Sequence, residues 1–146
     1  MAPSGVKVQI RRMVEADLEA VKEIDRLLFG EERAASWPLS VEDELAFYRP
    51  ALGFVAEVEG KVVGFLLGDI RRGRYGIGLS GWIDMIGVAP EYQRKGIARS
   101  LALAFWAECQ QKHIRTNIIV REDDETLIRF CTSVGFRRGK LINLEM

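Results

Sequence analysis

The sequence predicts a domain of the α/β (α+β) class, in which short strands alternate with helices. Strand-type alternation and helix-type spacing follow one another along the chain. Near residues 82–98 a strand runs through a basic, glycine-containing turn directly into a helix. The chain has 146 residues, which is the size of one ordinary domain. We therefore expect residues 1–146 to fold as a single unit.

The first predicted elements are a strand and two helices. Residues 6–10 alternate between apolar and polar side chains, as a strand does. Asp17 can cap a helix whose apolar residues recur at helical spacing as far as Gly30. A second helix is expected at roughly 40–49, where a Ser-x-x-Asp pattern resembles a capping pair.

The middle of the chain predicts a hairpin, a loop and a further strand. Strands at 54–58 and 62–67 flank a short Glu-Gly-Lys turn, which is typical of a hairpin. Residues 71–81 are rich in glycine and arginine, and we expect them to form a mobile loop. Residues 82–88 are mostly apolar, so we expect a strand that is covered on both faces.

The C-terminal part predicts two helices and two strands. The helix after the basic turn has one apolar stripe, which consists of Ile97, Leu101, Phe105 and Cys109. A strand at 117–120 follows, and then Asp123 or Asp124 caps a helix that ends at Gly135. A last strand is expected at 141–144.

Composition and charge exclude several classes of protein. The longest purely apolar run spans 101–107, whereas a membrane span needs about 20 residues. The first residues show no basic segment followed by an apolar one, so we expect no secretory signal. The 21 basic residues balance the 21 acidic ones, which argues against a nucleic-acid-binding protein. We expect neither a membrane nor a nucleic acid as a partner.

The cysteine and histidine content indicates the redox compartment of the protein and its capacity to bind a metal. Cys109 and Cys131 are too few for a disulfide framework and indicate free thiols in a reducing compartment, hence a cytoplasmic protein. The single histidine, His113, cannot build a metal site alone, and no cysteine or histidine pair has ligand spacing. We therefore expect no bound metal.

The most informative segment is the basic turn. Pro90 ends the preceding strand, and a turn with one glycine, Gly96, leads directly into a helix. The first N–H groups of that helix, the positive end of its dipole and the charges of Arg94 and Lys95 meet in one place. This combination suits a pyrophosphate, and the open alternative is an exposed structural turn. The spacing matches neither of the usual glycine-rich nucleotide motifs.

Three segments resemble the GNAT acyltransferase superfamily. Residues 93–98 read QRKGIA, which fits the superfamily signature Gln/Arg-x-x-Gly-x-Gly/Ala between a strand and a helix. Residues 86–92, IGVAPEY, are similar to the strand that leads into this signature. Residues 128–136, IRFCTSVGF, are similar to the closing helix that ends in Gly-Phe. The resemblance spans nearly the whole chain and implies a central mixed, mostly antiparallel sheet that is flanked by helices and splayed at the acyl-CoA site.

The resemblance implies that acetyl-CoA, or another acyl-CoA, binds in a V-shaped gap between the signature strand and the next strand. The backbone of the signature strand would bind the pantetheine arm, and the basic turn would bind the pyrophosphate. The missing Cβ of Gly96 would allow a close approach of the phosphates. The residues implied to contact acetyl-CoA are Ile86, Gly87, Val88, Gln93, Arg94, Lys95, Gly96, Ile97, Ala98, Arg99, Asp124 and Phe130.

The implied reaction is the attack of an amine on a thioester, which needs a base, an oxyanion donor and a proton for the leaving thiolate. Asp84 is the best candidate for the base, because it is the only acid in the strand 82–88 and a charge there is costly unless it faces a cleft. The alternatives for Asp84 are a substrate anchor or a structural partner of an arginine such as Arg71. Asp69 is the next candidate base, and the N–H of Ile86 is the implied oxyanion donor.

Two positions depart from the superfamily pattern. Cys131 stands where many members have a tyrosine that protonates the thiolate, so it is the candidate acid for the leaving group. A thiol is a weak donor, and we expect Cys131 mainly to pack while water supplies the proton. A nucleophilic role for Cys131 would lack a histidine partner. Asp124 replaces the usual asparagine at the start of this helix, which weakens its assignment to the acetyl-CoA site.

We expect an N-acetyltransferase that moves the acetyl group of acetyl-CoA directly to a primary amine in a ternary complex. The loop with Trp37 and Pro38 and the acidic stretch at 31–44 would suit a peptide N-terminus or a small polyamine-like cation. Members that acetylate protein N-termini also carry an aromatic residue and a proline in this loop. The alternative is a non-catalytic acyl-CoA-binding sensor, which the missing tyrosine favours.

The tail predicts a homodimer. Superfamily members usually finish with two strands, and the residues after Phe136 are too few for both. The apolar segment 141–144 at a free sheet edge would offer unpaired backbone groups, which a second copy of the chain would cover. The rival is a monomer whose edge is shielded by Arg137, Arg138 and Lys140.

Overall fold

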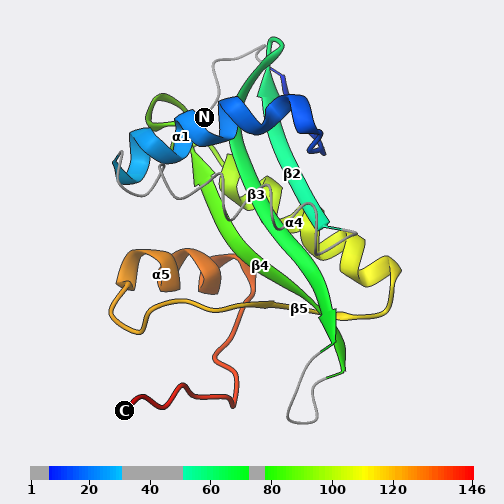
Figure 1. Ribbon diagram of the computed structural model, residues 1–146, viewed down its shortest axis with the longest axis vertical. Coiled ribbons are helices and arrows are strands. Elements are labelled where there is room, and N and C mark those ends of the chain that lie inside the picture. The colour runs from blue at the N-terminus through cyan, green and yellow to red at the C-terminus, as the bar shows by residue number, and fades with distance from the viewer. Residues whose placement is uncertain (1–6, 31–50, 73–77) are drawn as a thin grey trace.

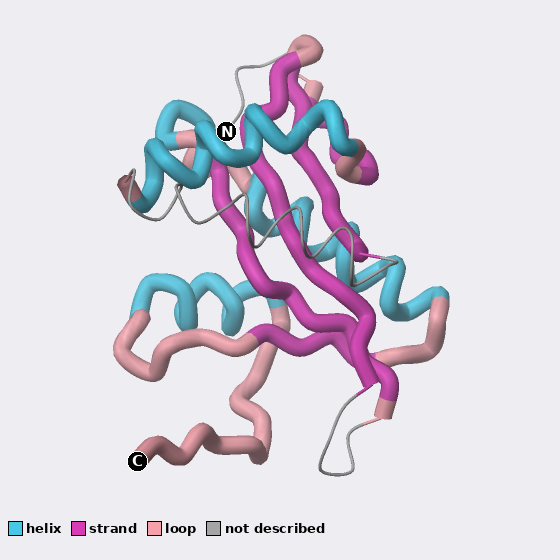
Figure 2. The backbone as a smooth tube through the Cα atoms, in the orientation of Figure 1, coloured by secondary structure: helices cyan, strands magenta, loops and turns pink. Residues whose placement is uncertain are grey.

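The computed structural model describes residues 7–30, 51–72 and 78–146. Their centre is a five-stranded sheet in which the strands lie side by side in chain order (Figures 1 and 2). The strands are β1 (Val8–Arg12), β2 (Ala51–Val58), β3 (Lys61–Arg72), β4 (Leu79–Val88) and β5 (Arg115–Ile118). The first four strands pair antiparallel, and β4 and β5 pair in parallel. The expected mixed, mostly antiparallel sheet is confirmed.

Helices cover both faces of this sheet (Figure 1). The helix α1 (Leu18–Phe29) packs on one face, where it meets Phe65 and Leu67 of β3. The helix α4 (Ile97–Gln111) packs on the opposite face against Leu66, which lies between those two residues on β3. The predicted apolar stripe of α4 is confirmed, because its four members are all at most 3% exposed. A third helix, α5 (Glu125–Val134), follows β5.

The helix α4 lies close to the sheet because two glycines face it. Gly68 of β3 and Gly81 of β4 carry no side chains, and residues of α4 occupy the space. A Cβ at Gly68 would collide with the ring of Phe105, and a Cβ at Gly81 would collide with the Sγ of Cys109. Direct contact with backbone therefore fixes the height of α4 above the sheet.

The strands β4 and β5 diverge halfway along β4. Their parallel pairing joins residues 80–83 to residues 115–118. Beyond this point no described strand pairs with β4 on the side of β5, while β3 still pairs with it on the other side. Asp84 is an extra residue in that β3–β4 ladder, since Gly68 faces Ile83 and the preceding residue of β3 faces Met85. The implied splay of the sheet is present, and Asp84 lies where it begins.

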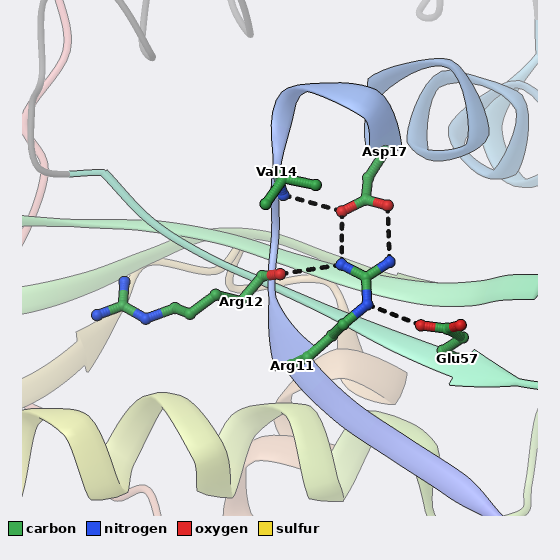
Figure 3. Close-up of polar contacts among 5 residues, drawn as sticks. All are labelled: Arg11, Arg12, Val14, Asp17 and Glu57. Carbon is green, nitrogen blue, oxygen red and sulfur yellow. Dashed lines mark hydrogen bonds and ion pairs between the residues drawn. The ribbon is translucent and has the colours of Figure 1, made fainter. Parts of the chain in front are cut away.

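Arg11 ties β1 to the start of α1 (Figure 3). Its guanidinium donates to both carboxylate oxygens of Asp17 at 2.8 Å each, and its Nε donates to Glu57 of β2 at 2.7 Å. The N–H of Val14 also donates to Asp17, at 2.8 Å. The bonds from Arg11 hold the pKa of Asp17 below its usual value. Asp17 is the N-cap residue of α1, as predicted, but its carboxylate makes no hydrogen bond to that helix, because it binds Arg11 and the N–H of Val14 instead.

Two predictions about the elements are wrong. The expected loop at 71–81 is strand at both ends, because Arg71 and Arg72 extend β3 and residues 79–81 begin β4, with Arg71 opposite Ser80. No strand forms at 141–144, where residues 136–146 contain neither helix nor strand. A strand needs a neighbour for its backbone, and no described strand lies beside this segment.

Some predictions fall on residues that the structure does not describe. The helix expected at 40–49 and the loop with Trp37 and Pro38 lie outside the described residues, as do residues 73–77. Among the helices of the described segments, none is long and apolar enough to cross a lipid bilayer.

Candidate active site

Two carboxylates and an arginine gather where β4 leaves β5. Arg71 of β3 donates from Nη2 to Oδ1 of Asp84 at 2.7 Å. The guanidinium carbon of Arg71 also lies 5.7 Å from the ring centroid of Trp82 on β4. Asp69 precedes Arg71 by two residues on β3, so the two side chains share one face of the sheet. The partnership of Asp84 with Arg71, one of the alternatives that the sequence left open, is present.

Asp69 is the more buried of the two carboxylates. The residue is 6% exposed, and its Oδ1 accepts a hydrogen bond from the N–H of Ile70 at 2.8 Å. Burial raises the pKa of Asp69, and the charge of Asp84 raises it further, while the Ile70 bond and the charge of Arg71 oppose the shift. A carboxylate with a raised pKa is a stronger proton acceptor near neutral pH. Asp69 is therefore a candidate base beside Asp84.

The C-terminal half of β4 presents an open backbone edge. Residues 86–88 pair with β3 on one side and with no described strand on the other. A Cβ on Gly87 would lie 2.8 Å from the ring of Phe65 and 2.9 Å from Leu28, so the glycine lets α1 approach β4. An open strand edge of this kind binds an extended chain with amide groups through backbone hydrogen bonds.

The turn after β4 leaves its backbone N–H groups available. The short 3₁₀ helix η2 (Pro90–Tyr92) leads into it, and Gly96 at its end has a φ of 81°. Within the described part of the chain, the N–H groups of residues 94–99 donate to no acceptor, and the first N–H of α4 with a partner is that of Ser100. A Cβ at Gly96 would meet no atom within 4 Å, so space lies open over the turn. Ile97 and Ala98 begin α4 here, where the helix dipole favours an anion.

The side chains of this turn have different contacts. The Nε2 of Gln93 donates to the carbonyl oxygen of Val88 at 3.0 Å and fastens the turn to the end of β4. The Nζ of Lys95 lies 5.7 Å from the ring centroid of Tyr92. Arg94 is exposed, and no described residue forms an ion pair or a hydrogen bond with its side chain.

Arg99 connects α4 to α5. Its Nη1 donates to the carbonyl oxygen of Ser133 in the last turn of α5 at 2.9 Å. The helix α4 and the C-terminal end of α5 are therefore joined beside the basic turn. This contact gives Arg99 a structural role in addition to its charge.

The remaining predicted site residues lie on or at the start of α5. Asp124 is the N-terminal cap, and its Oδ1 accepts a hydrogen bond from the N–H of Leu127 at 3.1 Å. Phe130 is half-buried. Cys131 is 5% exposed, and burial, with a smaller contribution from the charge of Asp124, raises the pKa of its thiol. A thiol that stays protonated agrees with the expectation that Cys131 packs rather than attacks.

Sequence reasoning missed Trp82 as a member of this site. The signal was present, because Trp82 and Asp84 stand two positions apart on one strand and so lie near the same face. Within the described segments, no group of three or more histidine, cysteine, aspartate or glutamate side chains is arranged to hold a metal ion.

Comparison with solved structures identifies the fold. An aminoglycoside N-acetyltransferase, AAC(6′)-Iy in complex with CoA, is 18% identical, with a TM-score of 0.82 over 100% of this chain and 98% of that one. AAC(6′)-IG, an aminoglycoside antibiotic 6′-N-acetyltransferase from Acinetobacter haemolyticus, is 21% identical, with a TM-score of 0.78 over 94% of this chain and 97% of that one. A transcriptional regulator from Bacillus halodurans is 18% identical, with a TM-score of 0.76 over 96% of this chain and 99% of that one. A search of curated protein sequences found no match.

The family follows from the sequence match. The family model described as "Acetyltransferase (GNAT) family" matches residues 18–136. This segment is most of the chain and contains every residue assigned to the site above. The chain therefore belongs to the GNAT acetyltransferase family and is an acetyl-CoA-dependent N-acetyltransferase.

Proposed function

We propose that this enzyme acetylates the primary amine of a small cationic molecule, directly and without an acetylated enzyme. One observation carries the proposal. Asp84 is the first residue of β4 beyond its pairing with β5, and we infer that its carboxylate is available to a substrate that enters the gap between the two strands. A proton acceptor at this point is what an amine needs before it can attack a thioester.

The residues present fit acetyl-CoA at two places, the open edge of β4 and the turn that follows it. The open edge of residues 86–88 suits the amide groups of the pantetheine arm. The available N–H groups of residues 94–99, together with Arg94, suit the pyrophosphate. When bound, acetyl-CoA supplies the activated acetyl group as a thioester.

The chain's own residues then perform the proton transfer and the charge stabilisation. Asp84 accepts the proton of the incoming ammonium, and Asp69 provides a second carboxylate beside it. The N–H of Ile86, on the open strand, donates to the oxygen on which negative charge develops. Cys131 keeps its proton and packs, and water protonates the leaving thiolate.

A small cation is the acceptor class that the site favours. Two carboxylates and the face of Trp82 form a surface that attracts ammonium groups. Two of the similar structures are named aminoglycoside N-acetyltransferases, and aminoglycosides are polycationic amines. A peptide N-terminus is the second candidate, and it rests on Trp37 and Pro38, which lie outside the described residues.

An acceptor screen tests this proposal. Thiol release from acetyl-CoA is followed with polyamines, aminoglycosides and unblocked peptides of neutral side chains. We expect saturable release with cationic small amines and little with the peptides. Preference for the peptides would overturn the acceptor class. Tight binding of acetyl-CoA by calorimetry, with no release for any amine, would instead support the acyl-CoA-binding sensor.

We also propose a homodimer in the cytoplasm. Leu141, Ile142 and Leu144 are 52%, 78% and 85% exposed, and no described strand covers the outer edge of β5. A second copy of this tail would bury these side chains and pair with that edge. The free thiols of Cys109 and Cys131 suit a reducing compartment.

Light scattering at micromolar concentration tests the dimer. We expect twice the chain mass of 16.5 kDa, and the chain mass itself after deletion of residues 141–146. A monomer for the full chain would overturn the dimer. A dimer that survives the deletion would overturn the role of the tail.

A further inference from the structure

The guanidinium of Arg71 is held by two groups that bind cations in general. One is the Asp84 carboxylate at 2.7 Å, and the other is the ring of Trp82 at 5.7 Å from the guanidinium carbon. A carboxylate and an aromatic face together are a common binding site for ammonium ligands. The contact with Asp84 does not depend on the forked shape of a guanidinium, because a single hydrogen bond joins the two groups.

This contact is easily broken. The side chain of Arg71 is 42% exposed and that of Asp84 is 27% exposed. An ion pair in contact with water stabilises the fold little, since water and salt screen it. The backbone of Arg71 is fixed by its pairing opposite Ser80, so the long side chain can swing away without any change in β3.

Departure of Arg71 would leave an excess of negative charge. Asp69 is 6% exposed, and it lies near enough to Asp84 for the two charges to interact. Among the described residues, no basic side chain other than Arg71 forms an ion pair with either carboxylate. A second cation that enters from solution would therefore be attracted to the place that the guanidinium leaves.

We propose that Arg71 occupies the subsite of the acceptor's ammonium group and exchanges with it when the acceptor binds. The subsite consists of the Trp82 ring and the carboxylates of Asp84 and Asp69. This inference rests on the proposed function and adds a specificity element to it. Arg71 acts as an internal competitor, so acceptors need a positive charge next to a short apolar body that covers the indole.

A titration without turnover tests the exchange. The probe is n-butylammonium, with uncharged n-butanol as the matched ligand, and the readout is the indole N–H signal of Trp82 in ¹⁵N NMR at constant ionic strength. Arg71→Met removes the charge but keeps an unbranched stem on the indole. Arg72→Met is the control variant, because Arg72 is the adjacent exposed arginine on β3 and forms no ion pair with a described residue.

We expect butylammonium to shift the Trp82 signal, and Arg71→Met to lower its Kd at least threefold. Arg72→Met should leave the Kd unchanged, and butanol should cause no shift. In the double variant Arg71→Met/Trp82→Leu, butylammonium should bind more weakly than in Arg71→Met, as measured from the backbone signals of β4. An equal or higher Kd in Arg71→Met would overturn the exchange, and so would a shift by butanol of the same size.

The acceptor screen separates this inference from the proposed function. Acetylation of cationic amines together with an unchanged Kd in Arg71→Met would overturn the exchange alone. A lowered Kd without any acetylation would support the exchange and overturn acetyl transfer to small cations. Acetyl-CoA affinity by calorimetry should be equal in the wild type and in both arginine variants, and a loss in Arg71→Met alone would assign Arg71 to the acetyl-CoA site instead.

Discussion

The side-chain amide of Gln93 donates to the carbonyl oxygen of Val88 at 3.0 Å. This bond joins the start of the basic turn to the end of β4, the strand whose open edge faces the gap. The two surfaces proposed for acetyl-CoA, the strand edge and the turn, are therefore linked by a contact within the protein. A shift of one surface relative to the other would strain or break this bond.

Gly96→Asp should weaken acetyl-CoA binding by roughly 100-fold, because a carboxylate about 4 Å from a phosphate costs several kcal/mol near a protein surface. Isothermal calorimetry measures the effect. Gly96→Asn is the matched control, since both side chains pay the strain of the positive φ, about 1 kcal/mol, and a Cβ there meets no neighbour. Equal affinities of the two variants would remove the pyrophosphate from this turn.

Asp84→Asn should lower kcat/KM by about 100-fold or more at neutral pH, which is the usual size of a general-base contribution. Part of the loss should return at high pH, where more of the acceptor is already a free amine. Rates over pH 6–10 check both statements. Asp123→Asn, which changes an exposed carboxylate in the loop before α5, serves as the control. A wild-type rate in Asp84→Asn would exclude Asp84 from the mechanism.

Cys131→Ala should keep a substantial part of the activity, and no acetyl group should appear on the wild-type enzyme mixed with acetyl-CoA alone. The reason is that burial raises the pKa of this thiol, so little thiolate forms at neutral pH. Intact-mass spectrometry and steady-state rates test the two parts. A stoichiometric adduct on Cys131 would contradict direct transfer.

Asp17→Asn should lower the free energy of unfolding by about 2 kcal/mol at pH 7, because it weakens the charged hydrogen bonds to Arg11. The pKa of Asp17 is lowered on folding, so the unfolded chain binds the proton more readily and the contribution grows with pH. The difference between wild type and variant should be complete well above pH 3.8 and shrink as the pH falls below it.

Urea denaturation at several pH values gives this difference. Glu23→Gln is the control, because its carboxylate is exposed and its partner Arg26 lies on the same helix. A difference for Asp17→Asn that stays constant from pH 7 to pH 2.5 would show that the charge of Asp17 contributes nothing.

Local patterns predicted the parts of the fold that local physics decides. The stripe of α4 and the turn before it follow from periodicity and from a glycine that accepts a positive φ. Asp17 stands at the predicted N-cap position, but it makes no capping bond to α1, because Arg11 on β1 binds the same carboxylate, which no local pattern reveals. Arg71 and Arg72 resembled loop residues in composition, yet the ladder with β4 continues through them.

Part of the candidate site was also predictable from local sequence patterns. The acid on the signature strand and its arginine partner were both named from the sequence, since a charge in an apolar strand needs an explanation. At 141–144 the local pattern predicted a strand that the structure lacks. The apolar residues of this segment have strand propensity, but propensity without a neighbouring strand does not make a strand within one chain.

The glycines under α4 determine more than packing. Phe105 and Cys109, in the C-terminal half of α4, contact the backbone at Gly68 and Gly81. These contacts set the distance of the helix from the sheet, and so they also position its first turn beside the gap. A methyl group added at either glycine would collide with Phe105 or Cys109 and push the C-terminal half of α4 away from the sheet. We expect such a variant to bind acetyl-CoA more weakly at the proposed pyrophosphate site, although the substitution contacts neither the turn nor the ligand.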